Sequence, residues 1–197
     1  MDREKMKARE ILPFARANFE SYAFSIYQNS YRCSVRLVDG TVLPNVLICE
    51  DGDYVNHTLE QIEHGRRQDE GRNRDHPKEQ YKRLRGQLTG INSVSPHDVR
   101  EIMPSPNAIP YKVIAKDLLF TRSEANYRLV FSDGKQLKLT THIGCQFLNL
   151  PAEYGVSDVR EVSEIYEEDQ TYECLDCCCF YCFATDWEKL DRFAIGN

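Results

Sequence analysis

Two β-hairpin patterns, each turning at an Asp-Gly pair, constrain the fold of this chain most strongly. Apolar and polar residues alternate over residues 31–37 before Asp39-Gly40, and apolar residues resume on the far side. The same alternation over 127–131 leads into Asp133-Gly134. A period of two that ends in Asp-Gly is typical of a half-buried strand entering a tight turn. The sequence therefore predicts two hairpins, and Pro44-Asn45 predicts a bulge or an edge position in the first.

A second motif follows each hairpin. Residues 98–101 read Asp-Val-Arg-Glu and so do residues 158–161, and a β-branched residue comes next in both places. The repeated order of hairpin and motif predicts a tandem duplication of one small β-rich unit. The motif lies 59 positions after Asp39 but only 25 after Asp133, so the first unit would carry an insertion of 34 residues.

The insertion, about 51–88, has helical features. Asn56 or Thr58 could cap a first helix, and Asp75 a second one with Pro77 in its first turn. Upstream, apolar residues at helical spacing within 2–23 predict an amphipathic helix in which Pro13 is an early residue.

Together these patterns predict an α+β chain with two related β-rich halves, shaped as small barrels or curled sheets, behind an N-terminal helix. The hairpins and the Asp-Val-Arg-Glu strands, and no other part of the chain, resemble Sm-type and SH3-type small barrels. We expect four parts: a first half with the insertion, a Pro-rich connector, a second half and a Cys-rich C-terminal segment, at 1–103, 104–110, 111–170 and 171–197.

The 197 residues carry a net charge of −6 and contain no apolar run near the ~20 residues that cross a bilayer. The first residues also lack the apolar stretch of a secretory signal. We therefore expect a soluble cytoplasmic protein with reduced thiols and no membrane contact.

Charge is distributed unevenly along the chain. Between His64 and Gly86, four acids face eight basic residues: Arg66, Arg67, Arg72, Arg74, Lys78, Lys82, Arg83 and Arg85. Between Glu153 and Asp176, nine acids face Arg160 alone. The basic stretch could contact RNA or DNA phosphates, or form a solvated helical face with internal ion pairs. It could also meet the acidic stretch, within one chain or between two copies.

Five of the eight cysteines lie within nine residues, as two C-x-x-C units separated by Cys178: Cys174, Cys177, Cys179 and Cys182. Thiolates at this spacing can bind zinc or an iron–sulfur centre, and Cys178 could also be a ligand. Alternatively, a fourth ligand could come from His142, Cys145 or another subunit. The alternatives are buried or redox-reactive thiols, since three of them share a helical stripe, and lipidation.

The sequence contains no phosphate-binding loop, dinucleotide turn, zinc-protease motif or serine-hydrolase motif. We therefore expect no catalytic activity. The preferred hypothesis is a non-catalytic binding or assembly module that acts through protein–protein contacts or self-association. Metal or redox chemistry at the cysteines is the alternative, and RNA or DNA binding the third.

Overall fold

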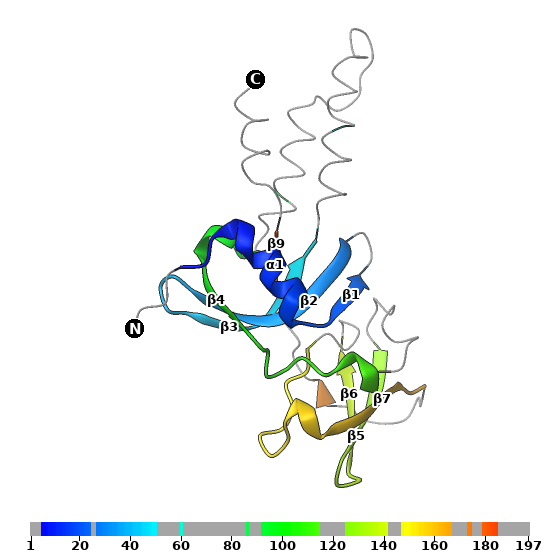
Figure 1. The fold of residues 1–197 in the computed structure, drawn as a ribbon. Coiled ribbons are helices and arrows are strands. Elements are labelled where there is room, and N and C mark those ends of the chain that lie inside the picture. The colour runs from blue at the N-terminus through cyan, green and yellow to red at the C-terminus, as the bar shows by residue number, and fades with distance from the viewer. Residues whose placement is uncertain are drawn as a thin grey trace.

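The computed structural model describes residues 5–24, 27–50, 60, 86, 92–114, 125–141, 147–166, 173–174 and 179–184. These residues form a mixed α+β fold with one α-helix and two sheets, drawn one above the other in Figure 1. Most of the predicted insertion and most of the C-terminal segment lie outside the described residues. Glu60 and Gly86 of the insertion are described, and both are helical.

The helix α1 spans Ala8–Asn18 and begins earlier than predicted. The carboxylate of Glu10 accepts a hydrogen bond from the backbone N–H of Lys7 at 3.1 Å, which closes the first turn. Pro13 therefore lies at the sixth helical position, and the prediction that it is an early residue was wrong. A proline there removes one backbone hydrogen bond, and burial of Ile11 and Ala15 against the first sheet compensates for that loss.

The first sheet is built around β2 (Tyr27–Leu37), which pairs antiparallel with β3 (Val42–Cys49). β1 (Ser21–Phe24) pairs with the first part of β2, and β4 (Val99–Met103) with its last residues. β9 (Phe180–Phe183) extends the sheet parallel to β3. The register of β2 and β3 shifts opposite Pro44-Asn45, which confirms the predicted bulge.

The second sheet has the same pattern of pairing. β5 (Ala125–Phe131) pairs antiparallel with both β6 (Gln136–Thr141) and β7 (Val159–Glu164), and β8 (Glu173–Cys174) runs parallel to β6. The order β7-β5-β6-β8 thus corresponds to β4-β2-β3-β9 in the first sheet. Neither sheet closes into a barrel among the described strands, so the open-sheet form of the prediction is the one observed.

The two Asp-Gly corners have matching geometry. Gly40 has φ of 91° and Gly134 of 84°, in the left-handed region that favours glycine. Oδ1 of the preceding aspartate accepts a hydrogen bond at 2.9 Å from the N–H two residues later, that of Thr41 in one corner and Lys135 in the other. These bonds are the largest cause of a lowered pKa at both Asp39 and Asp133.

The connection into the third strand matches as well. A single 3₁₀ turn, η1 (Pro96–Asp98) or η4 (Val156–Asp158), precedes β4 or β7. Its last carbonyl accepts a hydrogen bond from the corner, from Val38 N at 2.9 Å in one half and from Ser132 N at 2.8 Å in the other. The two halves therefore share strand order, corner and 3₁₀ turn.

Each sheet has its own hydrophobic core. The first includes Cys33, Val35, Val99 and Cys182 with the buried face of α1, and the second is centred on Tyr127 and Leu139. No α-helix within the described residues has the length and apolar content needed to span a bilayer.

Candidate functional site

A groove lies between α1 and β4. It has a volume of about 250 Å³ and is lined by Lys5, Met6, Lys7, Glu10, Phe14, Arg100, Glu101 and Ile102. The segment before α1 forms one wall because the N–H of Met6 donates to the carbonyl of Arg100 at 3.4 Å. This contact places the extended 5–7 segment beside β4. The groove thus combines an apolar lining with charged residues of both signs.

The apolar lining comes from three elements. Met6 lies before the helix, Phe14 on its exposed side and Ile102 in β4. Phe14 is 37% exposed, so part of its ring faces solvent. An exposed ring at the mouth of a groove gives a protein partner a surface to cover.

Cations outnumber carboxylates along the groove, because Lys5, Lys7 and Arg100 line it together with Glu10 and Glu101. Both carboxylates already have donors in this chain: Glu10 accepts from the N–H of Lys7, and Glu101 Oε2 lies 3.4 Å from Arg36 Nε. Lys5 and Lys7 are exposed at the rim. The N-terminal end of α1 opens here and adds a partial positive charge. Anionic side chains of a partner would therefore meet a favourable potential.

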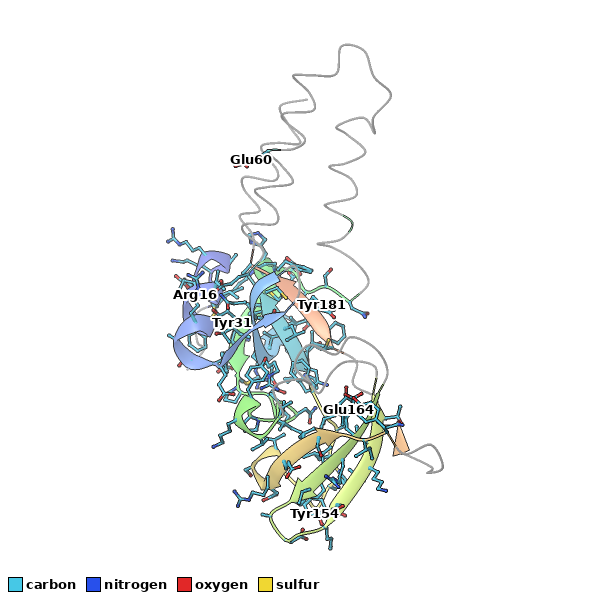
Figure 2. All side chains as sticks on the ribbon, turned by 90° about the vertical axis from the view of Figure 1, so that its right-hand side faces the viewer. Arg16, Tyr31, Glu60, Tyr154, Glu164 and Tyr181 are labelled. Carbon is cyan, nitrogen blue, oxygen red and sulfur yellow. The ribbon has the colours of Figure 1, made fainter. Side chains whose placement is uncertain are left out.

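A second polar cluster fixes α1 to the sheet. Glu50, buried just after β3, accepts hydrogen bonds from Arg16 Nε at 2.6 Å, Tyr31 Oη at 2.6 Å and Asn29 Nδ2 at 2.9 Å. Figure 2 shows Arg16 on the helix and Tyr31 on the sheet beneath it. Burial alone would raise the pKa of Glu50, but these three bonds and the Arg16 charge outweigh it and lower the pKa to about 2. Both carboxylate oxygens of Glu50 have hydrogen-bond donors, which suits a structural anchor.

A third cluster joins the two halves. The guanidinium of Arg32 in β2 lies over the ring of Tyr111 in η2 (Tyr111–Val113), and Glu20 contacts both residues. Nearby, Asn107 Nδ2 donates to Asn45 Oδ1 at 2.8 Å and to Asn149 Oδ1 at 3.0 Å. The connector at 104–110 is therefore held against both halves by polar contacts.

The structure divides the predicted cysteine ligands between the two sheets. Cys174 lies in β8 of the second sheet, and Cys182 lies in β9, buried in the core of the first. Cys179 is buried just before β9, while Cys177 and Cys178 lie outside the described residues. Within the described part of the chain, no group of three or more histidine, cysteine or acidic residues could hold a metal ion. The metal hypothesis stays a prediction.

All eight residues of the predicted basic surface also lie outside the described residues, so that hypothesis stays a prediction too. Sequence reasoning missed the α1–β4 groove. The available signal was the amphipathic helix beside two lysines, but nothing local showed that residues 5–7 would run along β4. Family models, curated proteins and solved structures were all compared with the chain, and none matches.

Proposed function

We propose that this chain is a non-catalytic assembly module that binds protein partners or further copies of itself through the α1–β4 groove. The observation that supports this most directly is the composition of the groove. It joins an apolar lining from Met6, Phe14 and Ile102 to exposed cations at the rim. An apolar centre with a charged rim is the usual organisation of a protein–protein contact.

Light scattering over a range of protein concentration and ionic strength tests the assembly function. We expect complexes larger than one chain at low salt that become smaller as the Debye length falls from about 10 Å at 0.1 M salt to about 3 Å at 1 M. A protein that stays monomeric at every concentration and ionic strength would contradict the proposal. Complexes that charge reversal at Lys5 and Lys7 leaves unchanged would also contradict it.

The assembly role also fits a duplicated architecture, and we propose that the two halves are copies of one unit. Matching strand order, corners and 3₁₀ turns support this. If the corners are equivalent, residues 38–41 and 132–135 are interchangeable. Replacing 38–41 with the sequence of 132–135 should change the free energy of unfolding by less than about 1 kcal/mol, since both corners need a glycine with positive φ and the exchanged side chains are exposed. A loss several times larger would contradict the equivalence.

A further inference from the structure

The strongest candidate occupant of the groove is a segment of the same protein. β7 ends at Glu164, and the last hydrogen bond to the sheet is donated by Ile165 N to the carbonyl of Asn126 at 2.8 Å. Tyr166 follows and is 84% exposed, more than any other large hydrophobic side chain described. In the sequence Glu167-Glu168-Asp169 comes next. An exposed aromatic ring thus stands within a run of acids.

We propose that Tyr166 and its flanking acids dock into the α1–β4 groove of a second copy of this chain. This inference rests on the proposed assembly function and names its partner. The tyrosine ring would pack against Phe14 and Met6, while the acids would face Lys5 and Lys7. An aromatic ring is a common interface anchor because it buries a large area and loses little conformational entropy. Thioether–ring and cation–ring contacts suit the same groove.

Among the described residues, Tyr166 does not line the groove of its own chain, so we take the partner to be a second copy. The groove is open and the ring of Tyr166 is largely exposed in the same structure. The groove belongs to the first sheet and Tyr166 follows the last strand of the β5–β7 pair in the second. Figure 2 shows Glu164, two residues before Tyr166, in the second sheet, and Arg16 on α1, which packs on the first sheet.

Because the groove and the docking segment are different surfaces, each contact joins the groove of one copy to the segment of another. Two copies that make this contact reciprocally form a closed symmetric dimer, and copies that make it in one direction only form a ring or an open chain.

Two full-length variants test this directly. The groove variant carries Lys5→Glu and Lys7→Glu, and the segment variant carries Tyr166→Ala. Each alone should lose self-association by at least about tenfold, as expected for an interface anchor. Mixed together, they should form a one-to-one dimer and nothing larger, because only the docking segment of the first and the groove of the second are intact. Sedimentation velocity on the separate and mixed proteins measures this.

Matched controls isolate the groove. Lys112→Glu with Lys135→Glu makes the same change in net charge at exposed positions away from it, and Tyr166→Phe keeps the ring. Both should self-associate within about twofold of the wild-type protein. If wild-type protein assembles and Tyr166→Ala assembles equally well, the docking inference is wrong while the assembly function stands.

Three other outcomes would also overturn the inference. A wild-type protein that is monomeric under all conditions removes the docking contact together with the assembly function. Complexes that disperse on nuclease treatment would show that nucleic acid holds the copies together. Failure to form the mixed dimer, with both variants folded by circular dichroism, would show that groove and segment do not meet.

Discussion

Arg32 and Tyr111 form a cation–ring contact, with Cζ of the arginine 3.6 Å from the centre of the tyrosine ring. Arg32 is only 5% exposed, so its charge is held in a largely water-excluded place. Glu20 Oε2 lies 3.9 Å from Arg32 Nη2 and accepts a hydrogen bond from the N–H of Tyr111 at 3.1 Å. These three residues connect the central strand of the first sheet to the segment that enters the second half.

Replacing Tyr111 with Ala should therefore lower the free energy of unfolding by about 2 kcal/mol, because a desolvated cation loses the ring that faces it. Tyr111→Phe keeps the ring and should retain most of that stability. Urea unfolding followed by fluorescence measures both. Lys112→Ala, an exposed neighbour, is the control and should change stability by less than about 0.5 kcal/mol. Equal losses for the Phe and Ala variants would contradict a role for the ring.

The Glu50 cluster predicts a dependence of stability on acid. The pKa of Glu50 is lowered from 4.5 to about 2 in the folded state, so its contribution is complete above pH 4.5 and is lost as the pH falls toward 2. Glu50→Gln should remove about 2–3 kcal/mol at pH 7 and much less near pH 2. Thermal unfolding across this pH range measures the difference. Glu153→Gln, at an exposed carboxylate, should follow the wild-type curve, and a Glu50→Gln deficit independent of pH would contradict the assignment.

The sequence predicted the features that depend on patterns among neighbouring residues. The alternation before Asp39-Gly40 and Asp133-Gly134 predicted hairpins that the structure contains, and Pro44-Asn45 predicted a bulge. A turn that needs a positive φ selects glycine at one position, so these signals can be recognised from neighbouring residues alone. The same alternation predicted a half-buried strand, and this was wrong, because Arg32 and Ser34 among its polar residues are buried as well.

The features that the sequence did not predict depend on contacts between distant parts of the chain. Arg32 is buried because Tyr111, 79 positions away, covers it, and no pattern within β2 encodes that meeting. β9 is short and pairs with β3 across most of the chain, so the cysteines around it were not recognised as a strand. The groove likewise requires residues 5–7 to meet β4. Register over such separations is set by global packing, which a single sequence does not display.

The glycines of the two corners allow a matched test of their equivalence. Gly40→Ala and Gly134→Ala should each destabilise the protein by about 1–2 kcal/mol, because φ of 91° and 84° brings a Cβ close to the following carbonyl. Gly155→Ala is the control, since Gly155 has φ of −100° and an added Cβ would lie no closer than 3.6 Å to its neighbours. Urea unfolding compares the three. A loss at one corner only would show that the corners carry different constraints.

The reactivity of the buried cysteines can distinguish packing from metal binding. Burial is the main cause that raises the pKa of Cys33, with the neighbouring Cys182 and Cys49 adding to it, so little reactive thiolate is present at neutral pH. We expect Cys33, Cys49, Cys179 and Cys182 to react slowly with iodoacetamide in the folded protein and rapidly in urea, as read by mass spectrometry.

Protection that arises from burial survives a chelator. If the C-x-x-C units instead hold zinc or iron, freshly isolated protein carries about one ion per chain, and a chelator exposes Cys179 and Cys182 while leaving Cys33 protected. Chelator-independent protection of all four, with no metal in the isolated protein, would contradict the metal hypothesis and assign Cys182 to the core of the first sheet alone.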